Sequence, residues 1–242
     1  MRKFFKLLVF SIIAIFTFNN VILALSISDA QKEYLFGNYQ EAIRIAKNIR
    51  SSDRSLYFLG LSYIKIGNYQ QARGYLRKLL KYYPNSKLYL QGKVKLADTY
   101  FLEKDYDSAR DIYNDLRERH SSFSATPLVL LRLAQIVSRQ GQWKEKNSYL
   151  SVIKSKYPLS SEMRFVEVLE GYGDFFTIQV GAFTDKKNAL SLKNELSSKY
   201  KIYIVEDNRV YKVRVGRYKD RYDVEKIAKK LDQEGYPTRI YP

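Results

Sequence analysis

The stretch FFTIQVGAF, residues 175–183, marks the point at which the sequence changes from one type of fold to another. Phe176, Ile178 and Val180 recur at every second position, which is the period of a β-strand with one buried face. Gln179 lies between two of these apolar residues and would therefore point to the opposite face of the sheet. The role of Gln179 depends on the elements that follow this strand and on what shares its face.

The residues after this stretch predict a helix, two strands, a second helix and a last strand. The predicted segments are a helix capped by Thr184 or Asp185, strands at 201–205 and 211–215, a helix at about 220–234, and a strand in YPTRIY, residues 236–241. A tight turn at Asp207 and Asn208 would join the second and third strands. The order β-α-β-β-α-β is the ferredoxin-like plan, in which both helices cover one face of a four-stranded antiparallel sheet and strands one and three are central.

The predicted hairpin assigns each side chain of the sheet to a face. It pairs Ile204 with Tyr211 and Tyr203 with Lys212, so that each pair shares one face. The face under the helices takes Phe176, Ile178, Val180, Tyr211, Val213 and Val215. The uncovered face takes Thr177, Gln179, Tyr203, Lys212, Arg214, Arg239 and Tyr241. Polar, basic and aromatic groups together favour a binding surface, although charges on such a face also serve to prevent strand-to-strand association.

A short phrase recurs in the preceding part of the chain. It reads GNYQEA at 37–42, GNYQQA at 67–72, KDYDSA at 104–109 and GQWKEK at 141–146, and its aromatic residues are 30, 37 and 37 residues apart. A period in the thirties indicates stacked units of a few secondary-structure elements. Apolar residues spaced at i, i+3, i+4 and i+7 on both sides of the phrase predict two helices per unit.

The best unit resembles the tetratricopeptide repeat, whose L-G-x-x-Y…G-x-Y-x-x-A…P pattern it meets. The matching residues are Leu59, Gly60, Tyr63, Gly67, Tyr69, Ala72 and Pro84. Later units depart from the pattern, with Lys104 in place of the turn glycine and Lys146 in place of the small alanine. The resemblance implies a curved helical scaffold whose concave groove binds a segment of a protein partner. It places Tyr57, Leu61, Ile64, Val94, Asp98 and Phe101 along that groove, where ordinary helix packing is the competing interpretation.

The C-terminal part resembles the SPOR domain, a peptidoglycan-binding module of bacterial cell-division and cell-wall proteins. The phrases FTIQVGAF and YKVRVGRY carry this resemblance. Lys212 stands where an arginine is common and Arg217 where a proline is common. The resemblance implies binding of glycan strands stripped of their stem peptides, which accumulate at the division septum. It makes the seven residues of the predicted uncovered face candidates for glycan contact.

The N-terminus predicts export from the cytoplasm. Arg2, Lys3 and Lys6 precede the apolar run LLVFSIIAIFTF at 7–18, and small residues near position 25 suit cleavage of a signal peptide. The alternative is an uncleaved membrane anchor at 4–25, which is about long enough to span a bilayer. Either form would deliver the chain to the periplasm or cell envelope.

Composition limits the chemistry of the chain. Its 242 residues include no cysteine and a single histidine, His120, which excludes thiol catalysis and a histidine-rich zinc site. No phosphate-binding loop or serine-hydrolase motif is present, so the sequence predicts neither an enzyme nor a cofactor. The net charge of +17 favours a polyanionic partner, and export makes an envelope polymer a better candidate than nucleic acid.

Together these features predict a multidomain protein that combines an α-helical solenoid with an α/β sandwich. The expected parts are a signal peptide or anchor at 1–26, TPR-like repeats at 27–165, a linker at 166–174 and a SPOR domain at 175–242. The expected function is that of a non-enzymatic adaptor in cell division or wall remodelling, with peptidoglycan glycan strands and an unidentified protein as partners. The alternatives are an envelope scaffold whose repeats carry the specific function, and an RNA-binding βαββαβ module.

Overall fold

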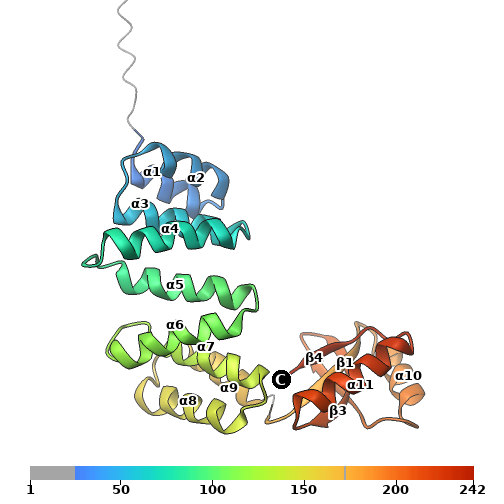
Figure 1. Cartoon of the computed structure of the whole chain (residues 1–242). Helices are drawn as coiled ribbons and strands as arrows, with labels where there is room; N and C mark the ends of the chain where they lie inside the picture. Colours follow the sequence, from blue (N-terminus) through green and yellow to red (C-terminus); the bar gives the residue numbers. More distant parts are fainter. Residues whose placement is uncertain (1–24, 172) are drawn as a thin grey trace, which may run out of the picture.

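The computed structural model describes residues 25–171 and 173–242, so the predicted signal peptide or anchor at 1–26 lies almost wholly outside the described residues. The chain forms a curved stack of helices followed by a domain with a four-stranded sheet, which lies beside the last repeats (Figure 1). Within the described ranges, no helix is both long enough and apolar enough to cross a membrane.

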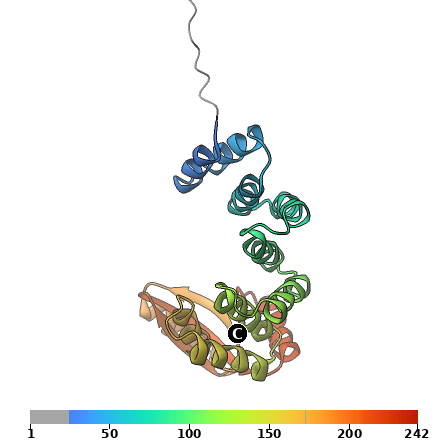
Figure 2. The ribbon, with the colours of Figure 1, turned by 90° about the vertical axis from the view of Figure 1, so that its left-hand side faces the viewer.

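Each repeat folds as two helices, and the recurring aromatic residue is the first residue of the second helix. The helices are α1 (Ile27–Leu35), α2 (Tyr39–Asn48), α3 (Asp53–Lys65), α4 (Tyr69–Tyr82), α5 (Tyr89–Leu102), α6 (Tyr106–Arg119), α7 (Thr126–Arg139), α8 (Trp143–Lys156) and α9 (Met163–Gly171). Seen from the side, they follow a curved path from α1 to α9 (Figure 2). The predicted helical solenoid is therefore confirmed.

The turn inside each repeat needs a residue in the left-handed backbone region. Gly67 has φ +76°, and its N–H and that of Asn68 donate to the Ile64 and Tyr63 carbonyls of the ending helix. Such a C-terminal cap favours glycine, which has no Cβ to clash there. Lys104, which replaces the glycine in the third repeat, takes the same conformation with φ +66°.

Small residues allow neighbouring helices to pack closely. A Cβ on Gly60 of α3 would lie 2.7 Å from the Leu76 side chain of α4, and one on Gly92 of α5 would lie 2.6 Å from Leu79. Ala72, Leu76 and Leu79 of α4 are fully buried. The repeat pattern of small and large residues thus sets the helix spacing.

The C-terminal domain has the predicted order of elements. They are β1 (Phe176–Phe183), α10 (Lys186–Leu196), β2 (Ile202–Asp207), β3 (Val210–Tyr218), α11 (Arg221–Gln233) and β4 (Arg239–Tyr241). The sheet is antiparallel with the order β2-β3-β1-β4, so strands one and three are central as expected. The side chains of Phe176, Ile178, Val180, Val213 and Val215 form one core with α10 and α11.

The hairpin between β2 and β3 differs from the predicted pairing. The turn residues are Asn208 and Arg209, with φ +50° and +65°, and Tyr203 pairs with Arg214 rather than Lys212. A two-residue turn with two positive φ values matches the twist of the flanking strands, which explains the shift. Because the shift is two residues along β3, every side chain keeps its predicted face.

The two domains are fixed to each other by residues that depart from the repeat pattern. Lys146 of α8, in the place of the small alanine, has 1% of its surface exposed. Its ammonium group donates to the Gly173 carbonyl at 3.1 Å and to the Asp174 carboxylate at 2.6 Å. Trp143 packs on Phe176 of β1 with ring centres 4.9 Å apart and donates to the Lys219 carbonyl at 3.1 Å.

Helix α9 connects the repeats to the sheet. Val166 and Leu169 of this helix are buried against α7 and α8. Residues 166–171 of the segment expected as a linker are therefore a packed helix, because these apolar residues at i and i+3 find a partner surface on the last repeat.

A candidate binding row on the sheet and a groove along the repeats

One row of side chains crosses all four strands of the sheet. Gln179 of β1 pairs directly with Arg214 of β3 on one side and with Arg239 of β4 on the other. Arg214 pairs in turn with Tyr203 of β2. Directly opposed residues on one face of an antiparallel sheet have Cβ atoms about 5 Å apart. Gln179 therefore lies between two guanidinium groups, with an aromatic ring at one end of the row.

The other three predicted residues of this face lie beside the row. Thr177 pairs with Tyr241, one pleat along β1 and β4. The Tyr241 ring lies between the Arg214 and Arg239 guanidinium groups, 4.8 Å and 5.0 Å from its centre. Lys212 pairs with Ala182 and forms an ion pair with Asp207, so it lies further from Gln179 than Arg239 does.

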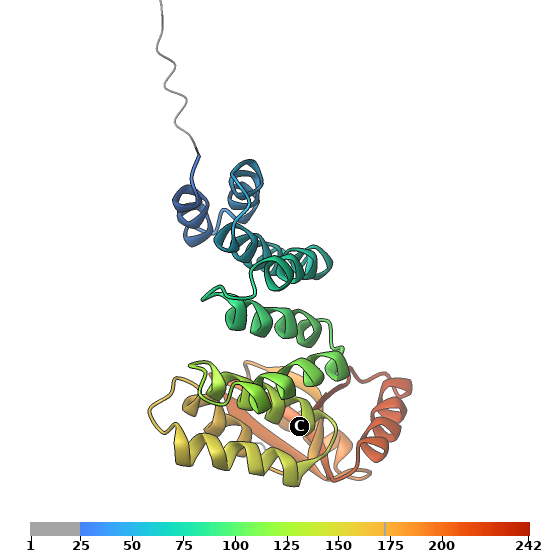
Figure 3. The same ribbon diagram turned by 60° about the vertical axis from the view of Figure 1, so that its left-hand side comes forward.

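The face that the sequence predicts to be uncovered is partly covered. Thr177 has 5% and Arg214 has 8% of its surface exposed, although α10 and α11 pack on the opposite face. Figure 3 shows the repeat helices on this side of the sheet and α11 on the other. The expectation of an open face is wrong because the sequence does not reveal that α9 folds back beside the sheet.

A cavity of about 300 Å³ remains between α9 and this face. Its lining comprises Val168, Gly171, Phe175, Thr177, Tyr203, Val205, Arg214 and Arg217. In the described part of the chain, the Thr177 hydroxyl and the Gln179 carbonyl oxygen are buried without a hydrogen-bond partner. Buried polar atoms of this kind are costly unless water or a ligand satisfies them. The volume is at the lower end of the range for small-ligand sites.

Arg217 is a candidate residue of this cavity that the strand alternation did not indicate. Its guanidinium group lies between the rings of Phe175 and Tyr203, 4.7 Å and 4.6 Å from their centres. Alternation from Arg214 would place Arg217 on the helix side, but Gly216 adopts φ +66° at an irregularity in the pairing of β1 and β3. Such a bulge shifts the faces by one residue. The glycine within YKVRVGRY is the signal in the sequence that marks it.

The helical groove contains five of the six residues expected there. A cavity of about 350 Å³ is lined by Tyr34, Tyr57, Leu61, Ile64, Lys65, Lys95, Asp98, Phe101, Leu102 and Arg132. Val94 is the exception, because it lies in the hydrophobic core of the repeats with 2% of its surface exposed. The groove therefore combines aromatic and aliphatic side chains with several cations.

Asp98 supports the groove from within the repeat core. Its carboxylate accepts hydrogen bonds from the Tyr113 hydroxyl at 2.6 Å and the Lys95 ammonium group at 2.8 Å. Burial and the neighbouring Asp98 charge raise the pKa of Tyr113 far above its usual range, so its hydroxyl remains a donor. Asp98 thus holds α5 to α6, which limits its freedom to contact a partner.

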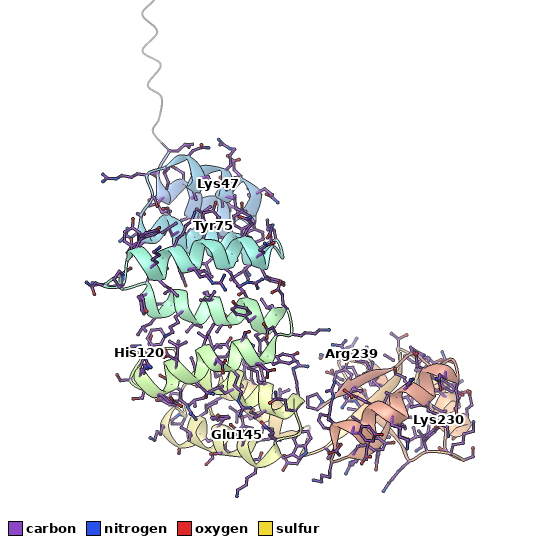
Figure 4. The ribbon with its side chains drawn as sticks, viewed as in Figure 1. Lys47, Tyr75, His120, Glu145, Lys230 and Arg239 are labelled. Carbon is purple, nitrogen blue, oxygen red and sulfur yellow. The ribbon has the colours of Figure 1, made fainter. Side chains whose placement is uncertain are left out.

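Among residues 25–171 and 173–242, no group of three or more histidine, aspartate or glutamate side chains is arranged to hold a metal ion. His120 is the C-terminal cap residue of α6 and lies on the side of the repeats away from the C-terminal domain, as Figure 4 shows.

Comparison with known proteins agrees with the two domains. The SPOR domain model matches residues 172–240, and a tetratricopeptide repeat model matches residues 54–86 and 93–122. No curated protein sequence matches the chain.

Several solved structures are similar to parts of the chain. One is the peptidoglycan binding domain of the B. subtilis cell wall lytic enzyme CwlC, at 24% identity over 28% of this chain and 86% of that one, with a TM-score of 0.26. MamA is 17% identical over 73% of this chain and 94% of that one, with a TM-score of 0.47. Pseudomonas aeruginosa PilF is 22% identical over 58% of this chain and 64% of that one, with a TM-score of 0.44.

Proposed function

The chain contains tetratricopeptide repeats and a SPOR domain, and from this premise we propose that it is a non-enzymatic adaptor of the cell envelope. The SPOR domain binds glycan strands of peptidoglycan that have lost their stem peptides, and the repeats bind a protein partner. The adaptor thereby places its partner in the periplasm where the wall is divided or remodelled. The N-terminus acts as a signal peptide or as a membrane anchor.

The row that crosses the sheet is the observation that supports glycan binding. A muramic acid without its stem peptide exposes a lactyl carboxylate, to which Arg214 and Arg239 donate charge-assisted hydrogen bonds. Gln179 between them offers both donors and an acceptor to acetamido and hydroxyl groups. The rings of Tyr203 and Tyr241 supply apolar surface for the sugar faces.

The cavity beside the row supports a site for a sugar residue rather than a flat contact. The Thr177 hydroxyl, which lines the cavity, lacks a partner within the described residues, as does the Gln179 carbonyl oxygen in the adjoining row, and a sugar hydroxyl or amide would satisfy them. Arg217, held between two rings, contributes a further donor at the rim. Lys212, whose ammonium group is paired with Asp207, makes an outer contact only.

Binding to cell walls tests this proposal. We expect the purified chain to sediment with amidase-treated sacculi and only weakly with intact sacculi. Gln179→Ala removes hydrogen bonds of about 1 to 1.5 kcal/mol in total and should weaken binding about five- to tenfold. Gln233→Ala, at the exposed end of α11, is the matched control and should bind as the native chain does.

The same assay separates the alternatives. Equal binding to intact and treated sacculi, or binding to neither, would contradict the proposal. Salt-sensitive RNA binding in place of wall binding would support the RNA-binding alternative. If deletion of 172–242 leaves the localisation of the chain in dividing cells unchanged, the repeats carry the specific function and the envelope scaffold is the better description.

A further inference from the structure

The groove of the repeats continues into a cleft between the two domains. Two further cavities lie between the repeats and the edge of the sheet. The one of about 380 Å³ lies between α5, α7 and α9 on one side and β4 on the other, and the one of about 910 Å³ lies between α5, α6 and α7 on one side and α11 and β4 on the other. Both are lined by Phe101, Arg139, Arg239 and Ile240. Phe101 and Arg132 also line the groove cavity, so the three cavities adjoin one another. We call the part between the domains the junction cleft.

The junction cleft is cationic. Its lining includes Lys104, Arg132, Arg139, Arg221 and Arg239 and contains no aspartate or glutamate. Arg132 is ion-paired with Asp98 and Arg221 with Glu225, whereas within the described ranges neither Arg139 nor Arg239 forms an ion pair with a carboxylate. Figure 4 shows Arg239 on the side of the C-terminal domain that faces the repeats. Cations concentrated between low-dielectric walls attract a negatively charged partner and raise its rate of association.

One wall of the cleft is the edge of the sheet. Strand β4 is the last strand in the order β2-β3-β1-β4 and pairs with β1 on one side only, as far as the structure describes the chain. An exposed edge offers backbone N–H and C=O groups to an added strand. Thr238 to Pro242, which contain this edge, line the junction cleft.

The opposite wall offers apolar contacts. Phe165 and Val168 of α9 are exposed large apolar side chains, and both line the smaller cavity together with Phe101 of α5. An extended peptide turns successive side chains to opposite sides. A peptide lying along β4 would therefore place one set of side chains against these residues and the other set toward the arginines.

We propose that the junction cleft binds an extended acidic segment of a protein partner, in which acidic and apolar residues alternate and whose backbone pairs with β4. This inference rests on the proposed function, since it specifies the chemistry of the partner of the repeats. It also makes the SPOR domain part of the partner site. Arg239 belongs both to the glycan row and to the cleft, so the two ligands bind next to each other.

A designed peptide tests the inference without knowledge of the natural partner. The probe is a fluorescein-labelled peptide of four Glu-Val repeats, and fluorescence anisotropy measures its Kd for the purified chain. We expect binding that weakens with salt, and at least tenfold weaker binding of a Lys-Val peptide of equal length. N-methylation of alternate amides should weaken binding about tenfold, because it blocks backbone pairing with β4.

Charge reversal on the repeat side locates the site. Arg139→Glu should weaken binding of the Glu-Val peptide about tenfold or more. Arg54→Glu, at the exposed start of α3 outside the cleft, should leave the Kd of the same peptide within about twofold of the native value. Binding of Arg139→Glu to amidase-treated sacculi should equal that of the native chain, which separates this inference from the proposed glycan function.

Three results would overturn the inference. The first is binding of the Lys-Val peptide as tight as that of the Glu-Val peptide. The second is an unchanged Kd for the Glu-Val peptide after Arg139→Glu. The third is a combined result, in which the native chain does not bind the Glu-Val peptide and Arg139→Glu loses binding to the wall. That result would assign the cleft to the glycan. If the N-methylated peptide binds as tightly as the unmodified Glu-Val peptide, the peptide does not pair with β4 as an added strand.

Discussion

At the scale of single residues, Lys104 shows what the loss of a consensus glycine costs. The turns at Gly37, Gly67 and Gly141 have φ between +76° and +85°, and Lys104 has φ +66° at the equivalent position. A residue with a Cβ is destabilised in this conformation by about 1 to 2 kcal/mol. The repeat keeps the conformation because the helix cap at Phe101 and Tyr100 is formed as in the other units.

Replacement of this lysine by glycine should stabilise the protein. Lys104→Gly relieves the left-handed strain, and the greater freedom of glycine in the unfolded chain offsets about 0.5 to 1 kcal/mol of the gain. We expect a net rise of about 0.5 to 1 kcal/mol in the free energy of unfolding, measured by urea denaturation. Gly67→Ala, the converse change in the second repeat, should lower the free energy of unfolding. A loss of stability in Lys104→Gly would contradict the strain argument.

At the scale of elements, α8 differs from the other second helices because it joins two domains. Its first residue is Trp143 and its fourth is the buried Lys146, where the earlier repeats have tyrosine and alanine. Both side chains contact residues 173–176 or the turn before α11. A helix with no further repeat behind it thus uses larger and charged residues to contact the sheet domain.

Restoring the consensus alanine should release this contact. Lys146→Ala removes both hydrogen bonds of the ammonium group, and charged hydrogen bonds that are partly buried contribute about 1.5 to 3 kcal/mol. We expect proteolytic cleavage between residues 171 and 175 to become about tenfold faster, measured by mass spectrometry of timed digests. Lys144→Ala, at an exposed position of the same helix, should be cleaved at the native rate. Equal rates in both variants would contradict a role of Lys146 in holding the domains together.

At the scale of the whole molecule, the fixed placement of the two domains depends on the charge of Asp174. Burial acts to raise the pKa of this carboxyl group, but the hydrogen bonds from Lys146 and Asn147 outweigh it and lower the pKa below its usual value. A carboxylate with a lowered pKa contributes stability above its unfolded-state pKa of about 3.9. That contribution is lost as the pH falls through the folded-state pKa.

The domain contact should therefore hold at neutral and mildly acidic pH and weaken below about pH 4. Small-angle scattering of the native chain should show a constant radius of gyration from pH 7 to 5 and an increase below pH 4. Lys146→Ala, in which the contact is already weakened, should show a smaller change across the same range. A native chain that expands between pH 7 and 5 would contradict the role of Asp174.

Sequence patterns alone determined the two folds and the faces of the sheet. The repeat phrase predicts pairs of helices because its residues meet local requirements, those of the turn and of close helix packing. The strand alternation assigns Gln179, Arg214 and Arg239 to one face of the sheet. These properties depend on neighbours in the sequence or on the strict two-residue period of strands. The bulge at Gly216 and the register of the hairpin depend on backbone geometry and were not predicted.

Only the tertiary structure decided how the two domains meet. The sequence shows Lys146 as a departure from a pattern, and the structure shows it as a contact to residues far along the chain. The same arrangement brings α9 beside the sheet, buries Thr177 and Arg214, and places β4 at the end of the repeat groove. Local patterns report the period and face of each element, whereas the junction cleft arises from packing between surfaces that no local pattern relates.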